Sequence, residues 1–114
     1  MNIVGKLWGS TVALESNPFM SFHRAENKRG FPCSKHLHRN KWNGFYVESG
    51  VLLVRVYNDN GIEDVTTLGA GDYTSVAPGV KHRFESVENT VLFEIYWPAE
   101  HAEDIVRDDE GGPL

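Results

Sequence analysis

The residues of this chain whose types and spacing suit chemistry are three histidines, His36, His38 and His82. His36 and His38 are separated by one residue, and residues two apart on a β-strand project to the same side. Two imidazoles on one face can share a cation, with nitrogen–metal distances of about 2.0–2.1 Å for zinc. His82 follows a Pro-Gly turn far downstream, where a strand is expected to begin. If that strand lies beside the first, the pattern predicts a three-histidine metal site.

Short β-branched and aromatic runs, separated by turn residues, must position these histidines. Turn signals rich in Gly, Pro, Asn and Asp recur at short intervals, which is typical of an all-β sandwich or barrel. We expect eight to ten strands, with candidates within residues 11–16, 19–25, 44–50, 50–58, 62–68, 73–79, 80–87 and 90–98. Asn60-Gly61 suits the tight turn of a hairpin because these residues take positive φ readily.

Side-chain alternation along these strands predicts which residues face the interior. Asn43, Phe45 and Val47 are expected on one inward face, and Phe84 is expected on the face of His82. We interpret the two phenylalanines as core residues, because large apolar side chains in such positions are most often buried.

Composition indicates one globular domain, because 114 residues with 40% hydrophobic and 24% charged residues are ordinary for such a unit. We expect a single domain over residues 1–114, with its core at about 30–97 and an acidic, Gly-rich tail at about 103–114. The end of that tail, residues 107–114, is expected to be solvated or disordered. Helical periodicity is weak, and its strongest stretch, residues 99–109, is short and acidic.

Charge and cysteine content narrow the classes of partner. The net charge of −5 argues against a nucleic-acid binder, which needs a basic surface for the phosphates. No apolar run approaches the ~18 residues of a membrane span, and the N-terminal residues do not read as a signal peptide. The single cysteine, Cys33, forms no intrachain disulfide and is expected to be a small buried residue. We therefore expect a cytoplasmic protein without a nucleic-acid or membrane partner.

Two ordered motifs resemble those of the cupin family. The first motif of that family is an HxH pair followed by a glutamate and a glycine, and its positions fall here on His36, His38, Asn43 and Gly50. The second is a glycine, a short strand, a Pro-Gly turn and a histidine, and its positions fall on Gly71, Pro78, Gly79 and His82. The resemblance covers about residues 30–97, and the chain departs from it where Asn43 replaces the glutamate.

The resemblance implies a small RmlC-like jelly roll, a double-stranded β-helix with a divalent metal ion inside the barrel. It carries the family's ligands onto His36, His38 and His82, and the fourth ligand onto Asn43. An amide oxygen binds a hard cation more weakly than a carboxylate because the amide is neutral. Such a site leaves the charge of the ion uncompensated by protein and keeps positions open for water or an anionic ligand. Zinc, iron, nickel and manganese all remain open as the ion.

Other residues near the expected pocket are less informative. His23 and Tyr73 are the candidates for a catalytic base or acid, since each lies in an expected strand. Lys41 would attract an anionic substrate if it lay at the rim of the pocket. We favour a solvated lysine at that position.

Three functions remain open, since the fold does not determine the chemistry. The first is a metal-dependent enzyme acting on a small polar molecule, with the chemistry of a sugar isomerase or of a dioxygenase. The second is a non-catalytic module that binds a small ligand such as a sugar. The third is a metal-independent epimerase, in which a histidine removes a proton and a tyrosine returns one. We also expect a homodimer to which the N-terminal segment contributes, because pairing covers an exposed edge strand.

Overall fold

The computed structural model describes residues 3–98, 105–109 and 111. Eleven strands and no helix lie in this part of the chain. The strands are β1 (Ile3–Lys6), β2 (Gly9–Asn17), β3 (Met20–Asn27), β4 (His36–His38), β5 (Trp42–Ser49), β6 (Leu52–Tyr57), β7 (Glu63–Leu68), β8 (Tyr73–Val76), β9 (Lys81–Ser86), β10 (Thr90–Trp97) and β11 (Ile105–Arg107). Among the described residues, nothing resembles a helix long and apolar enough to cross a membrane.

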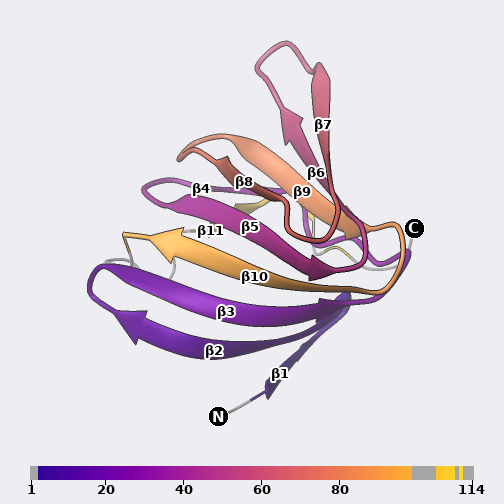
Figure 1. Ribbon diagram of the computed structural model, residues 1–114. Helices are drawn as coiled ribbons and strands as arrows, with labels where there is room; N and C mark the ends of the chain where they lie inside the picture. Colours follow the sequence, from indigo (N-terminus) through magenta and orange to yellow (C-terminus); the bar gives the residue numbers. More distant parts are fainter. Residues whose placement is uncertain (1–2, 99–104, 110, 112–114) are drawn as a thin grey trace.

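The strands form two sheets in which neighbouring strands are antiparallel (Figure 1). The first sheet has six strands in the order β1-β2-β3-β10-β5-β8, and the second has five in the order β11-β4-β9-β6-β7. This arrangement confirms the predicted all-β jelly roll. The strands beyond the expected runs are β1, β4 and β11, which are three or four residues long and carry little periodic signal.

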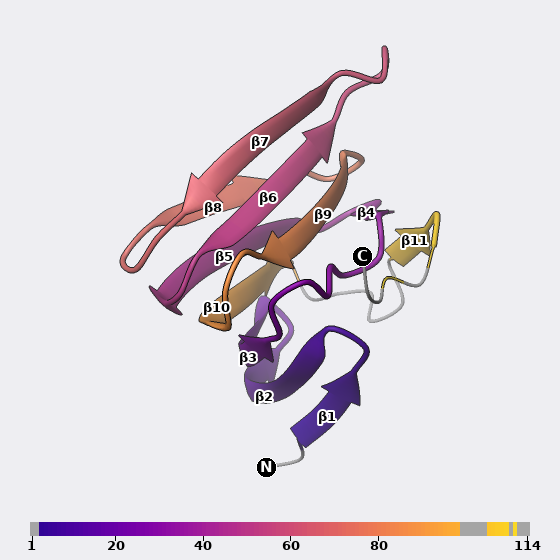
Figure 2. The same cartoon turned by 90° about the vertical axis from the view of Figure 1, so that its right-hand side faces the viewer.

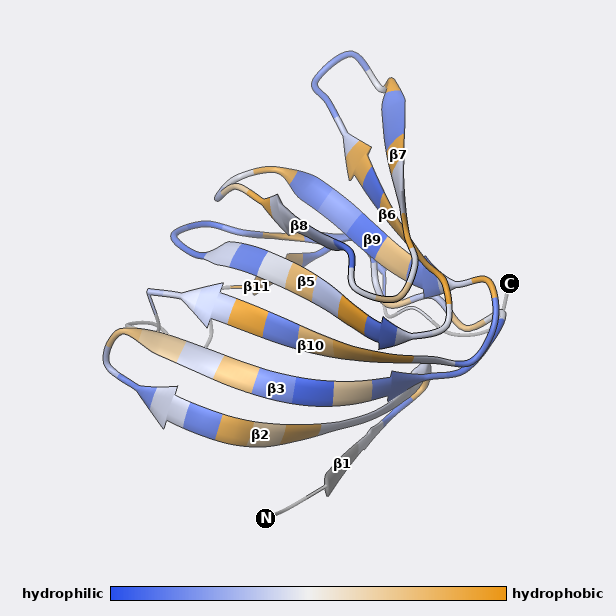
Figure 3. Ribbon diagram, in the orientation of Figure 1, coloured by the Kyte–Doolittle hydropathy of each residue, from blue (hydrophilic) through white to orange (hydrophobic). Residues whose placement is uncertain are grey.

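Strand β5 shows why the sequence folds in this way. Its side chains alternate, so that Asn43, Phe45 and Val47 are buried whereas Trp42 and Tyr46 are exposed. This period of two is the pattern expected of a strand with one face on the core. Figure 3 shows hydrophilic and hydrophobic residues interspersed along β5. The predicted inward faces are therefore confirmed.

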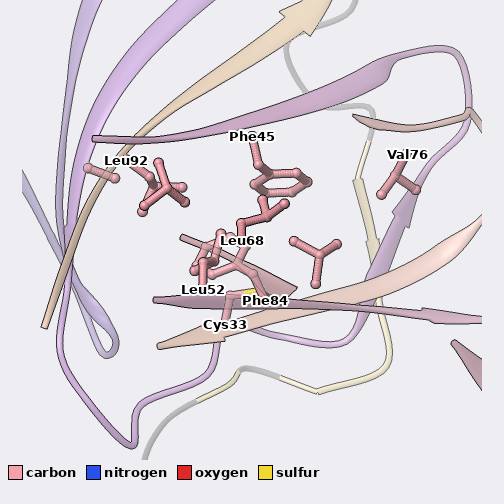
Figure 4. Close-up of a cluster of buried hydrophobic side chains, with 10 residues drawn as sticks. Cys33, Phe45, Leu52, Leu68, Val76, Phe84 and Leu92 are labelled. Atoms are coloured by element: carbon pink, nitrogen blue, oxygen red, sulfur yellow. Dashed lines mark hydrogen bonds between the residues drawn. The ribbon is translucent and has the colours of Figure 1, made fainter. Parts of the chain in front are cut away.

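The core lies between the two sheets and consists of ten buried hydrophobic residues contributed by both (Figure 4). Phe45 of β5 meets Phe84 of β9 edge to face, with ring centroids 5.6 Å apart. Cys33 joins this cluster, as predicted, and its backbone N–H donates to the carbonyl oxygen of Phe84 over 3.0 Å. The core thus ties β9, which carries His82, to the opposite sheet.

The turn before β9 requires glycine and is fixed to β4. Gly79 has a φ of 80°, a left-handed conformation that glycine adopts without a steric cost. Its N–H donates to the carbonyl oxygen of His38 over 2.7 Å. The Pro-Gly turn predicted from the sequence therefore holds the start of β9 against the strand that carries the other two histidines.

Of the tail that was expected to be solvated or disordered, residues 107–109 are exposed to solvent, and contacts with β4 and β9 hold them in place. β11 pairs with β4, with Ile105 opposite His38 and Arg107 opposite His36 (Figure 2). Asp108 accepts from Lys81 Nζ over 3.0 Å, and Asp109 pairs with Arg83. The acidic residues are ordered because they meet cations of β9, and residues 103, 104, 110 and 112–114 lie outside the described part.

Candidate metal centre

Three buried histidines meet where β4 lies beside β9. His36 and His38 project from β4, and the pairing of the two strands sets His36 opposite His82. One nitrogen of each ring lies within 4.8 Å of those of the other two. The ring centroids of His36 and His82 are 4.5 Å apart. Two short segments that are distant in sequence thus bring together the three residues singled out at the start.

Hydrogen bonds fix the orientation of two of these rings. Nδ1 of His36 lies 2.7 Å from the carbonyl oxygen of Ser34, and Nδ1 of His82 lies 3.0 Å from that of Val80. A carbonyl oxygen only accepts, so we assign the ring hydrogen to Nδ1 in both histidines. Each Nε2 is then left with its lone pair, the tautomer in which histidine binds a metal.

Burial favours the neutral imidazole of His36 and of His82. Burial, together with the neighbouring His82 and His38, lowers the pKa of His36 to about 3. Burial also lowers the pKa of His82, against the opposing effect of the Val80 carbonyl. Since a metal binds only the neutral form of the ring, His36 and His82 suit a cation near neutral pH.

Asn43 lies beside the histidines and supplies a further oxygen. Its Oδ1 is 3.3 Å from Nε2 of His82. With the hydrogen of His82 on Nδ1, these two atoms are both acceptors, and a shared cation would satisfy both. Metal bonds of about 2.1 Å at tetrahedral or octahedral angles separate two donor atoms by roughly 3.0–3.4 Å. The donor set therefore fits a metal ion, with Asn43 at the position of a fourth, neutral ligand.

A buried carboxylate that the sequence did not reveal lies behind Asn43. Glu94 of β10 is only 4% exposed, and its Oε2 accepts from Tyr96 Oη over 2.6 Å and from Asn43 Nδ2 over 3.4 Å. Burial raises the pKa of Glu94 and holds that of Tyr96 well above its usual range. Glu94 and Tyr96 alternate inward with Leu92, so an acidic residue inside an apolar run was the available signal.

The family model of the cupin domain matches residues 23–97, most of the chain. This chain belongs to the cupin family. The resemblance read from the two motifs is thereby confirmed, and the match also includes residues 23–27 of β3, outside the expected core of about 30–97. No curated protein matches this cupin.

Solved structures show the same fold over nearly all of this cupin. Oxalate decarboxylase from Bacillus subtilis at pH 4.6 has a TM-score of 0.80 and 16% identity, covering 94% of this chain and 30% of that one. CapF with the inhibitor 3-isopropenyl-tropolone has a TM-score of 0.79 and 19% identity, covering 93% and 33%. A structure concerned with the Mn(II) centres of the Bacillus subtilis enzyme has a TM-score of 0.76 and 12% identity, covering 94% and 30%. The chain spans about a third of these proteins, and the likeness shows the fold alone.

A cavity of about 920 Å³ opens beside the histidines of this cupin. Its wall includes His36 and His38, together with Glu94 and Tyr96. Lys41 also lines the cavity and is only 8% exposed, so the expectation of a solvated lysine is wrong. Lys41 directly precedes β5 and is two residues from the buried Asn43, so alternation along the chain places both on the inward face.

The structure separates the two residues considered as catalytic candidates. His23 of β3 lines the cavity, and its ring meets that of Tyr96 edge to face at 5.6 Å. Tyr73 of β8 is 50% exposed and covers Gly44, where an added Cβ would lie 2.4 Å from the Tyr73 hydroxyl oxygen. Because Gly44 alternates with the inward Asn43, Tyr73 covers the outer face of the sheet and does not line this cupin's cavity.

Proposed function

We propose that this cupin is a metal-dependent enzyme acting on a small polar molecule. The observation that carries the proposal is the convergence of three buried histidines, His36, His38 and His82, of which the first two line a large cavity. These three residues would hold a divalent ion, with the amide oxygen of Asn43 as a weaker fourth ligand. Zinc, iron, nickel and manganese fit the donors, and manganese has the added support of the Mn(II) centres in a protein of the same fold.

A bound ion supplies Lewis-acid polarisation of a substrate oxygen, as an isomerase needs, or redox chemistry in the case of iron and a dioxygenase. The chain's own residues have separate tasks. Glu94 presents a carboxylate at the cavity wall and is the group we assign to proton transfer. Tyr96 and Asn43 donate to one oxygen of that carboxylate and so orient it. His23, which lines the same cavity, is a second candidate for proton transfer.

The metal content of the protein tests this proposal. Protein purified without added metal or a metal-affinity step is expected to contain about one divalent ion per chain, measured by mass spectrometry of the element. His38→Ala is expected to lose the ion, whereas His23→Ala, which alters the same cavity without removing a ligand, should retain it. Wild-type protein that carries no metal and takes up none on dialysis would refute the proposal.

A metal-independent epimerase is the second candidate, and one contact favours it. His23 and Tyr96 lie with ring centroids 5.6 Å apart in the cavity, which pairs a base with an acid. Under this alternative, His23→Ala abolishes turnover of a protein that holds no metal. Under the first, turnover requires the ion and disappears in His38→Ala.

We further propose that the protein forms a homodimer through the outer face of the six-stranded sheet. Trp42, Tyr46 and Tyr73 are exposed large side chains on β5 and β8, and aromatic residues are enriched at interfaces. Light scattering is expected to give twice the chain mass of 12.8 kDa. Tyr46→Lys should shift the protein to a monomer, whereas Phe19→Lys, which changes an exposed aromatic outside this face, should not. A monomer in the wild type would contradict the proposal.

A further inference from the structure

The candidate metal site provides no negative charge of its own. Its donors are three neutral imidazoles and one neutral amide, so an ion held there keeps its full positive charge. Glu94 is the acidic side chain among the described residues of the cavity wall, and it is engaged with Tyr96 and Asn43. The ligand itself is therefore the group left to balance the charge of the ion.

Lys41 adds a second positive charge to this cavity. It is 8% exposed, and none of the five ion pairs formed by described residues includes it. Placing an ammonium away from bulk water without a counter-charge is costly, and buried charges are normally paired. Because no carboxylate among the described residues pairs with Lys41, an anionic ligand in the cavity would supply a counter-charge for its ammonium group.

The positive charge extends around the cavity. Lys6 and Arg107 also line it, from β1 and β11. Burial lowers the pKa of His23, and the charges of Lys41 and Lys6 lower it further, so their field reaches the cavity interior. The whole chain has a net charge of −5. A cationic cavity in an acidic protein selects for anionic small molecules, because the local potential and the overall charge have opposite signs.

From this geometry we infer that the substrate is a small carboxylate-bearing molecule, whose carboxylate lies between Lys41 and the ion held by the histidines. The inference rests on the proposed function and narrows it, since a neutral sugar has no need of the ammonium. A cavity of about 920 Å³ is large enough for a metabolite, and Trp8 and Tyr96 provide aromatic wall for its apolar part. A carboxylate has two oxygens and can therefore contact both the ammonium of Lys41 and the ion, whereas a hydroxyl has one oxygen.

Calorimetric titration of the manganese-loaded protein tests this inference. Malonate is the probe, malonamide is its neutral counterpart of similar shape, and inorganic phosphate is the competing anion. We expect malonate to bind at least tenfold more tightly than either. Lys41→Met should weaken malonate binding at least tenfold, and Lys41→Arg should recover part of the loss. Lys28→Met removes the same charge from an exposed position and should change the affinity less than twofold.

The outcomes distinguish this inference from the proposed function. Metal content and thermal unfolding of each variant show whether the site and the fold persist. Equal malonate affinities in the wild type and in a folded, metal-loaded Lys41→Met protein would overturn the inference and leave the metalloenzyme intact. If Lys41→Met does not fold, the test is whether the wild type binds malonate more tightly than malonamide. Equal affinities for the two molecules would overturn the inference. A wild type that binds no metal refutes the proposed function, whereas Lys41-dependent malonate binding by that protein would still support an anionic ligand.

Discussion

Nε2 of His82 and Oδ1 of Asn43 lie 3.3 Å apart, and both are acceptors when the hydrogen of the ring is on Nδ1. The same amide donates to Glu94 through Nδ2 over 3.4 Å. Asn43 therefore links the candidate ligands to the buried carboxylate, and its neutrality lets Glu94 remain close. A carboxylate at position 43 would repel the carboxylate of Glu94, because the two carry the same charge.

Asn43→Asp tests the role of that neutrality. We expect the variant to bind a divalent ion at least about tenfold more tightly, ~1.4 kcal/mol, because a carboxylate compensates the charge of the ion. The metal-free variant should be less stable than the wild type, because the introduced carboxylate and Glu94 repel each other. Thermal unfolding with and without zinc measures both effects. Asn60→Asp adds the same charge in an exposed turn, and an equal response there would show that Asn43 is not near the ion.

Phe45 connects the core to the site and is expected to be a large contributor to stability. It is fully buried, with its ring 5.6 Å from that of Phe84 and 6.2 Å from that of His82. Phe45→Ala should lower the free energy of unfolding by about 3–5 kcal/mol in urea denaturation, because it removes apolar contacts and leaves a cavity. Phe19→Ala, at a position 78% exposed, should change it by less than ~0.5 kcal/mol. Similar losses in both variants would contradict the structure of the core.

The acid sensitivity of the metal-free protein should depend on His23. Burial, Lys41 and Lys6 lower the pKa of His23 in the folded state. Below about pH 6.5, unfolded histidine takes up a proton that the folded state resists, so stability is lost as the pH falls from there through the folded pKa. Wild-type protein should therefore lose more stability between pH 7.5 and 5.5 than His23→Gln. Urea unfolding curves that shift in parallel for both proteins would contradict this.

Much of the site was predictable because strand alternation and turn preferences both depend on residues that are close in sequence. The spacing of His36 and His38 places both rings on one side of any strand, and a Pro-Gly turn precedes His82. Which strands become neighbours depends on pairing between residues far apart in sequence. The pairing of His36 in β4 with His82 in β9, which brings the histidines together, could be inferred only from the family resemblance. The inward direction of Asn43 followed from alternation alone.

The parts that escaped prediction involve polar groups whose burial depends on the whole fold. Glu94 has no motif around it, and its partners come from its own strand and from β5. Lys41 was expected in solvent because lysine is most often exposed, yet the course of the chain into β5 places it at the cavity. β11 has three residues, too few for any periodicity to mark it.

The ion pair between Asp109 and Arg83 should hold β11 against its neighbour. Asp109 also accepts from the N–H of Lys35 over 3.0 Å, and together these contacts lower its pKa although burial opposes them. Asp109→Asn should lower global stability by no more than about 1 kcal/mol, as is usual for an exposed pair. It should nevertheless speed hydrogen exchange of the backbone amides shared by β4 and β11. Asp59→Asn in an exposed turn is the control, and unchanged exchange in Asp109→Asn would contradict the role assigned to the pair.

The three histidines all belong to the five-stranded sheet, whereas Asn43, Glu94 and His23 belong to the six-stranded one. Under the proposed function, substitutions in β3 or β10 would change the groups that act on the substrate, whereas the imidazoles that would hold the ion would stay in place. For a protein engineer, a library confined to β3 and β10 would diversify the groups that face a ligand and leave in place both the imidazoles of β4 and β9 and the amide of Asn43.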